Sequence, residues 1–262
     1  IYEYEGRDGR ARKHTGDEIE LLRDYRNRHA LYKLDPDLQA AHARFPFVVT
    51  WDDHEVDNNY AAGLSEEEGF PAELFLRRRA EAYQAYFEHM PLRRSSFPTG
   101  PRMQLYRQFA YGDLASFFVL DTRQYRTDQP CGDRSGPSCD GVTAADATML
   151  GEVQEQWLVD GLDRSSSRWN VLPQQVMMAR VDRVPGEAER ISMDQWSGYE
   201  APRRRLMEFL ARRRPANPVV LTGDIHTNWV NDLKVDYADE AAPVVGTEFV
   251  GTSITSGGDG SD

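Results

Sequence analysis

Two apolar runs that each end in acidic residues and a histidine constrain the fold more than any other feature of the chain. Residues 48–55 read VVTWDDHE, and residues 219–226 read VVLTGDIH. Apolar, β-branched runs of this kind predict strands that are covered on both faces. In open α/β sheets, ligands bind beyond the carboxyl ends of the strands. The repeated pattern therefore predicts an α/β protein with a site at the ends of two strands.

Helical and strand patterns alternate along the rest of the chain. Helical patterns cover residues 16–33, 36–44, 71–90, 152–162 and 202–214, and Thr15 with Glu18 forms a possible capping box for the first. Strand patterns cover residues 45–51, 103–111, 114–121, 169–172, 218–222, 233–237 and 244–252. Several strand connections are too short for parallel crossovers, which indicates a mixed sheet. We expect a layered α/β fold with two packed sheets in a mixed sandwich flanked by helices.

Length and charge narrow the class of protein. The 262 residues suit one large domain or two small ones, and we favour a single domain over residues 1–262 that is incomplete at both ends. The formal net charge of −12, from 43 acidic and 31 basic residues, argues against a protein that binds duplex nucleic acid. No apolar window is long enough for a transmembrane helix, and no signal peptide opens the chain. Oligomeric state leaves no signal in the sequence.

The two cysteines, Cys131 and Cys139, lie in the loop-like sequence DQPCGDRSGPSCDG. A disulfide between them fits an oxidising compartment, and two free thiols are the alternative. A structural zinc site is not expected, because two cysteines without a nearby histidine pair do not supply four ligands.

The acidic and histidine residues that follow the two apolar runs are suitable metal ligands. Carboxylate oxygens and imidazole nitrogens bind divalent and trivalent cations, and an aspartate can bridge two ions, so a dinuclear site is the natural inference. Gly223 is expected to allow the sharp turn before Asp224. The alternative is that Asp52 and Asp53 cap a turn. Four other histidines are expected to be surface or packing residues: His14, His29, His42 and His89.

Seven blocks of the chain, in order, resemble the alkaline phosphatase D (PhoD-like) metallophosphatases of the calcineurin-like superfamily. They are IYEYEG, WDDHEVDNNY, LDTRQYRTDQPCGD, LGEVQEQWL, WNVLPQQVMM, LTGDIHTNW and GTEFVGTSITSGGDG. The resemblance implies a two-sheet sandwich and a site holding Fe³⁺ and Ca²⁺. It implies Tyr2 as the tyrosinate on iron, Asp53 and Asp224 as ligands towards calcium, and His226 as a ligand towards iron. The family's GDY block begins before Ile1, so its bridging aspartate lies outside this sequence.

The implied activity is hydrolysis of phosphate monoesters or diesters by a metal-bridging hydroxide. Asp53 and His54 would be catalytic, with His54 stabilising charge or protonating the leaving oxygen. Asp52 and Arg123 are candidates for substrate binding, and a surface salt bridge is an equal alternative for Arg123. Substrates would be small phosphate esters or phosphodiester polymers, in a secreted, periplasmic or cell-envelope protein.

Two other functions remain possible from the sequence. One is a catalytically silent fragment of the same fold that binds metal or ligand. The other is glycosidase action by Asp52 and Glu55, which is disfavoured because two acids on one short loop would not straddle a sugar ring. Trp51, Tyr60 and Trp229 either line a pocket or, as we favour, pack the core.

Overall fold

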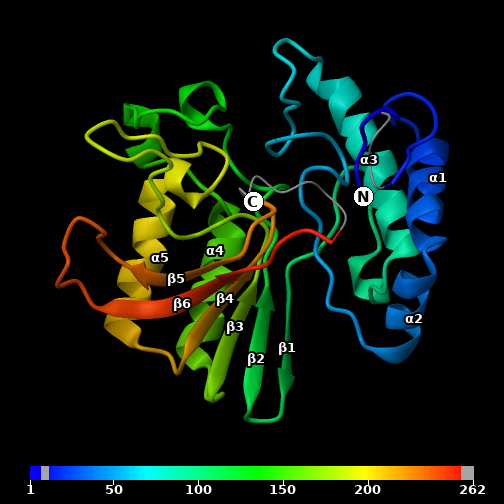
Figure 1. Ribbon diagram of the computed structural model, residues 1–262. Coiled ribbons are helices and arrows are strands. Elements are labelled where there is room, and N and C mark those ends of the chain that lie inside the picture. The colour runs from blue at the N-terminus through cyan, green and yellow to red at the C-terminus, as the bar shows by residue number, and fades with distance from the viewer. Residues whose placement is uncertain (7–11, 255–262) are drawn as a thin grey trace. The chain divides into compact units, whose positions relative to one another are not determined.

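The chain divides into two compact units, Ile1–Leu105 and Tyr106–Asp262, each with its own apolar core. The computed structural model describes residues 1–6 and 12–254 (Figure 1). The end of the last family-like block, residues 255–260, therefore lies outside the described residues. The apolar residues of each part of the chain pack within that part, and the single domain expected over residues 1–262 stays a prediction.

Unit 1, residues 1–105, is built on helices. They are α1 (Leu22–Lys33), α2 (Pro36–Arg44), α3 (Ala72–His89) and the short 3₁₀ helix η1 (Arg94–Ser96). α1 packs along α3, and the buried rings of Tyr25, Phe75 and Tyr83 belong to one core cluster. α2 begins as predicted, since Asp35 accepts hydrogen bonds from the backbone N–H groups of Asp37 and Leu38.

The strand predicted for residues 45–51 is wrong. This segment forms none of the named strands, and none of those strands lies in the described part of unit 1. Phe45 and Val48 are 63% and 46% exposed, so the segment is not covered on both faces. Trp51 is buried because its ring stacks on Tyr83 of α3, with ring centroids 4.0 Å apart. The end of the apolar run therefore packs against α3.

The start of the first helix also differs from the prediction. α1 begins at Leu22, and its N-cap residue Leu21 makes no side-chain capping bond. Thr15 and Glu18 form no capping box, because the Glu18 carboxylate accepts a hydrogen bond from Arg78 Nη2 at 2.8 Å. A contact between distant segments thus replaces the local one.

Unit 2, residues 106–262, contains a mixed six-stranded sheet, as predicted. Its strands are β1 (Arg107–Tyr111), β2 (Ala115–Val119), β3 (Trp169–Pro173), β4 (Pro218–Thr222), β5 (Trp229–Lys234) and β6 (Val244–Val250). The order is β1-β2-β3-β4-β6-β5, with parallel pairing from β2 to β6 and an antiparallel strand at each edge. β5 begins four residues earlier than the predicted strand at residue 233.

Two helices of unit 2 connect its parallel strands. α4 (Gly151–Arg164) lies between β2 and β3, and α5 (Glu200–Arg213) lies between β3 and β4. Both cover one face of the sheet (Figure 1), as right-handed crossovers between neighbouring parallel strands require. Three short 3₁₀ helices occur in the connections: η2 (Pro130–Gly132), η3 (Asp140–Thr143) and η4 (Trp196–Gly198).

The layered α/β class is confirmed, but the described residues contain one sheet and not two. On β4 and β6, Leu221 and Phe249 are paired in register and remain 40% and 45% exposed. The second sheet of the expected sandwich is not formed by residues 1–6 or 12–254.

The predicted disulfide joins Cys131 to Cys139, with their Cα atoms 6.2 Å apart. The loop that it closes is held to the rest of unit 2 by two backbone hydrogen bonds between Gly136 and Ile191, of 3.0 and 2.9 Å. The crosslink therefore fixes a loop that is otherwise poor in regular structure.

Candidate active-site residues

Asp53 lies at the start of a tight turn in unit 1 and is 4% exposed. Its Oδ1 accepts a hydrogen bond from the backbone N–H of His54 at 2.9 Å, and its Oδ2 accepts one from Asn59 at 3.0 Å. Its carbonyl also accepts from Val56 and Asp57. Asp53 thus forms the turn-capping bonds considered as the alternative. Such bonds are compatible with a ligand, because carboxylates that bind metals are themselves hydrogen-bonded.

The His54 imidazole lies in a cluster of acidic and aromatic residues. Its Nδ1 is 2.8 Å from Oε2 of Glu3, which is 1% exposed. The rings of Tyr2 and Tyr4 are 4.4 and 4.9 Å from the His54 ring between centroids. Burial lowers the pKa of His54, but the negative charges of Asp53 and Glu3 outweigh burial and raise it to about 9. His54 is therefore an imidazolium at neutral pH.

Glu3 was not identified from the sequence. It is surrounded by aromatic residues in IYEYEG, and an isolated glutamate there carries no recognisable signal. Its Oε1 is buried and has no hydrogen-bond partner among the described residues. An unpaired buried carboxylate oxygen is unfavourable unless positive charge compensates it, and the protonated His54 supplies such charge.

The aromatic residues around His54 are held by their own contacts. Tyr4 donates a hydrogen bond from its hydroxyl to Oδ1 of Asn58 at 2.9 Å, and burial together with Glu3 raises the pKa of its phenol. The backbone carbonyls of Tyr2 and Tyr4 both accept hydrogen bonds from Arg28 of α1. Arg28 thereby anchors the segment that carries Tyr2 to the core of unit 1.

Asp224 and His226 lie in unit 2, on the loop that follows β4. Both have positive φ angles, +73° and +58°, in the left-handed region that non-glycine residues seldom adopt. Gly223 has no such angle, so the left-handed residues of this loop are Asp224 and His226. Backbone strain of this kind is found where function requires a defined side-chain position.

Hydrogen bonds hold this loop on both sides. Oδ2 of Asp224 accepts from Nε2 of Gln195 at 3.1 Å, and the carbonyl of His226 accepts from the hydroxyl of Thr252 at 2.6 Å. Gln195 was not identified from the sequence, since nothing in its neighbourhood marks it. The loop after β4, which carries the half-buried residues Asp224 and His226, is therefore held in one conformation.

Arg123 is fully buried in unit 2. Its two terminal nitrogens bind the two carboxylate oxygens of Asp194 at 2.6 and 2.7 Å. Arg126 and Gln129 donate to the same carboxylate at 2.6 and 2.9 Å. Burial would raise the pKa of Asp194, but the two arginines hold it well below its usual range. The geometry gives Arg123 a buried ion pair where a surface salt bridge was the alternative, and substrate binding by Arg123 stays a prediction.

The remaining candidates have structural contacts. The backbone N–H of Asp52 donates to Oε2 of Glu55 at 2.8 Å, and substrate binding by Asp52 stays a prediction. Trp51 and Tyr60 are buried in the core of unit 1, whereas Trp229 of β5 is 41% exposed. The preference for core packing therefore holds for two of the three aromatic residues.

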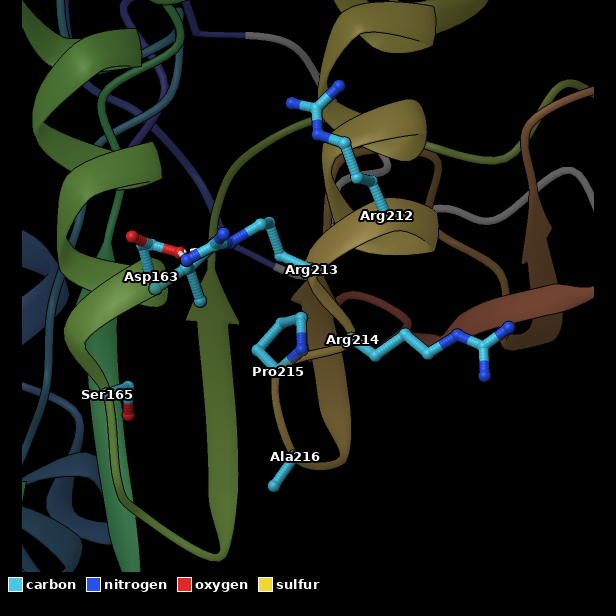
Figure 2. A pocket seen from close by; sticks show the side chains of 8 residues that line it. Asp163, Ser165, Arg212, Arg213, Arg214, Pro215 and Ala216 are labelled. Atoms are coloured by element: carbon cyan, nitrogen blue, oxygen red, sulfur yellow. Dashed lines mark hydrogen bonds and ion pairs between the residues drawn. The ribbon is translucent and has the colours of Figure 1, made fainter.

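Unit 2 has a cavity of about 260 Å³, which none of its candidate residues lines (Figure 2). It is lined by the ends of α4 and α5 and by Pro215 and Ala216, just before β4 begins, whereas Asp224 follows the other end of β4. Arg213 reaches Asp163, while Arg212 and Arg214 point elsewhere (Figure 2). The cavity is a surface notch, and its cationic groups do not converge.

No group of three or more histidine, cysteine, aspartate or glutamate side chains in the described ranges is arranged to hold a metal ion. The candidate ligands are nonetheless chemically suited to hard cations. They offer carboxylate and phenol oxygens and one imidazole nitrogen, which bind trivalent iron and divalent calcium. The unpaired Glu3 oxygen adds negative charge to the same cluster as Tyr2 and His54.

Comparisons with known proteins agree with the family-like blocks. The family model for the PhoD-like phosphatases matches residues 1–262. Alkaline phosphatase D of Bacillus subtilis (strain 168) is 53% identical over 260 residues, which are 99% of this chain and 44% of that protein. A solved structure described as the structure of PhoD matches with a TM-score of 0.95 and 52% identity, over 100% of this chain and 51% of that one. This chain spans about half the length of these relatives, and it belongs to the PhoD-like phosphatase family.

Proposed function

We propose that the protein hydrolyses phosphate esters with the help of bound metal ions. The observation that carries this proposal is that the phosphatase family match extends over residues 1–262, so that it includes both loops with an aspartate and a histidine. The Bacillus relative is named alkaline phosphatase D, and we propose the same kind of activity for this chain.

Tyr2, Asp53, Asp224 and His226 are the proposed metal ligands, and Fe³⁺ and Ca²⁺ are the proposed ions. A phenolate suits a ferric ion, and carboxylates suit both ions. When bound, such cations neutralise phosphate oxygens and lower the pKa of the attacking water. The hydrogen bonds to Asp53 and Asp224 support these assignments, because they restrict the orientation of each carboxylate.

His54 is proposed to act on the substrate. Glu3 engages its Nδ1 and fixes the ring, so Nε2 is the nitrogen directed to a phosphate or leaving-group oxygen. With a pKa raised to about 9, the imidazolium donates a hydrogen bond or a proton at neutral pH. Asp53 orients the turn that carries His54 and completes the proposed catalytic pair.

Asp52 and Arg123 are the proposed substrate-binding residues. Asp52 is half-buried beside Asp53. Arg123 is engaged by Asp194, so its contribution would be indirect, through Asp194 and the next residue in the chain, Gln195. Phosphate monoesters, diesters and phosphodiester polymers all fit the proposed chemistry.

A location outside the cytoplasm is proposed as well. The disulfide between Cys131 and Cys139 supports it, because disulfides persist in oxidising compartments. Across residues 1–6 and 12–254, no helix is both long and apolar enough to cross a membrane.

The test is hydrolysis of a chromogenic phosphomonoester and a chromogenic phosphodiester by the purified protein, with its metal content measured in parallel. Bound iron and calcium-dependent turnover are expected, and the faster ester identifies the substrate class. His54→Ala should reduce turnover about 10²- to 10⁴-fold without changing metal content. Metal binding without turnover of either ester would instead favour the catalytically silent alternative.

A further inference from the structure

Gln195 connects a rigid network in unit 2 to the loop that carries Asp224. It is 3% exposed and donates from Nε2 to Oδ2 of Asp224 at 3.1 Å. Its Oε1 accepts a hydrogen bond from Nη2 of Arg183 at 3.5 Å. An arginine can only donate, so this contact identifies the amide oxygen and leaves the amide nitrogen facing the Asp224 carboxylate.

The backbone of Gln195 is fixed on both sides. Before it, the Asp194 carboxylate receives hydrogen bonds from Arg123, Arg126 and Gln129. After it, the N–H of Trp196 donates to the carbonyl of Met177 at 3.2 Å. Charge-assisted bonds to a buried carboxylate are among the strongest polar contacts, so the Gln195 side chain projects from a rigid base.

Asp224 itself has little regular structure to orient it. It follows the end of β4 with a φ of +73°, and its neighbour Ile225 makes a local hydrogen bond to Gly223 at 3.0 Å. The Gln195 amide therefore ties the half-buried carboxylate to a part of unit 2 that is rigid.

We propose that Gln195 is a positioning residue that holds the Asp224 carboxylate in the orientation for binding Ca²⁺. This inference rests on the proposed function, in which Asp224 is a calcium ligand. Hydrogen bonds from neighbouring groups orient ligating carboxylates, and their loss weakens metal affinity about 10- to 100-fold. The Asp194 network then acts through Gln195, which gives the buried Arg123 an indirect role.

The experiment is a calorimetric titration of the purified, iron-loaded protein with Ca²⁺. Gln195→Met removes the donor while it keeps the length of the side chain, and we expect Ca²⁺ to bind about 10- to 100-fold more weakly. Iron content should not change, because Gln195 contacts Asp224 and not His226. Gln195→Leu also removes the donor without adding charge, and it serves if the methionine variant folds poorly.

The matched control is Gln156→Met on α4. Gln156 also donates from Nε2 to an aspartate, Asp160, at 2.7 Å, but on an exposed helix surface. The Ca²⁺ affinity of the Gln156→Met variant should equal that of the wild type. A purely structural role of Gln195 would lower the melting temperature of the metal-free protein and the fraction that binds, without changing the affinity of the folded fraction.

Asp224→Asn separates the two ways in which the inference can fail. If Asp224→Asn weakens Ca²⁺ binding and Gln195→Met does not, the positioning role is wrong and the proposed function stands. If Asp224→Asn binds Ca²⁺ as the wild type does, the assignment of Asp224 as a ligand is wrong, and the role of Gln195 fails with it.

Discussion

At the scale of single residues, the pairing of Glu3 with His54 is the feature that most affects the proposed chemistry. Glu3 is one of the negative charges that raise the pKa of His54 to about 9, so Glu3→Gln should lower that pKa towards the ordinary value near 6.5. NMR titration of the His54 ring in the metal-free protein measures it. Glu20→Gln, an exposed acid in the same unit, should leave the titration unchanged. An unchanged pKa in Glu3→Gln would contradict the pairing.

His29 provides a second prediction at this scale. It is 1% exposed, and neither ring nitrogen has a hydrogen-bond partner among the described residues. Burial lowers the pKa of His29 to about 2, so it is neutral in the folded state. The unfolded state takes up a proton below pH 6.5, so this stabilising contribution is present above pH 6.5 and is lost as the pH falls towards 2.

Urea unfolding at pH 7.5 and pH 5 measures how much His29 contributes to the pH dependence of the unfolding free energy. Between these values, wild-type protein should lose about 2 kcal/mol more unfolding free energy than His29→Leu does. His42→Leu, at a half-exposed histidine on α2 whose pKa burial also lowers, should change the pH dependence less than His29→Leu does, because His42 is less buried. Equal pH dependence in the wild type and His29→Leu would show that His29 is not the group responsible.

At the scale of secondary-structure elements, the sequence predicts elements well where local signals and packing agree. α2 begins at Asp35-Pro36 as expected, because the cap and the proline both act within the first turn. Residues 45–51 have the composition of a buried strand, but Trp51 stacks on Tyr83 and the segment forms none of the named strands. Whether an apolar segment meets a helix or a strand depends on distant residues, which one-dimensional periodicity does not contain.

The same limit applies to the candidate site. The aspartates and histidines were identified because they follow apolar runs, a signal local to each motif. Glu3 and Gln195 reach His54 and Asp224 from distant positions in the sequence, so only the folded structure reveals them. Arg123 looked accessible from its place after a strand, and only the structure shows Asp194 beside it.

The packing of α4 on β2 gives a prediction about an element. A Cβ atom added at Gly161 would lie 2.5 Å from the ring of the buried Phe118. Gly161→Ala should therefore destabilise unit 2 by about 1–2 kcal/mol, although alanine favours helix by about 1 kcal/mol. Urea unfolding measures the change. Phe118→Leu combined with Gly161→Ala should recover part of the loss relative to the sum of the single variants, and strict additivity would exclude this contact as the cause.

At the scale of the whole molecule, the proposed metal ligands belong to both units: Tyr2 and Asp53 to unit 1, Asp224 and His226 to unit 2. A ligand that binds only the folded state stabilises it, by about 2.7 kcal/mol at a concentration one hundred times its dissociation constant. Metal loading should therefore raise the melting temperature, and chelation should reverse the rise.

Substitutions in each unit test whether both contribute. Asp53→Asn and Asp224→Asn should each reduce the metal-induced rise in melting temperature, measured by differential scanning calorimetry with Ca²⁺ and iron present. Asp163→Asn removes an aspartate that pairs with Arg213 beside the cavity of Figure 2, and it should keep the full rise. If only Asp224→Asn reduced the rise, Asp53 would not be a ligand, and its carboxylate would serve only to cap the turn that presents His54.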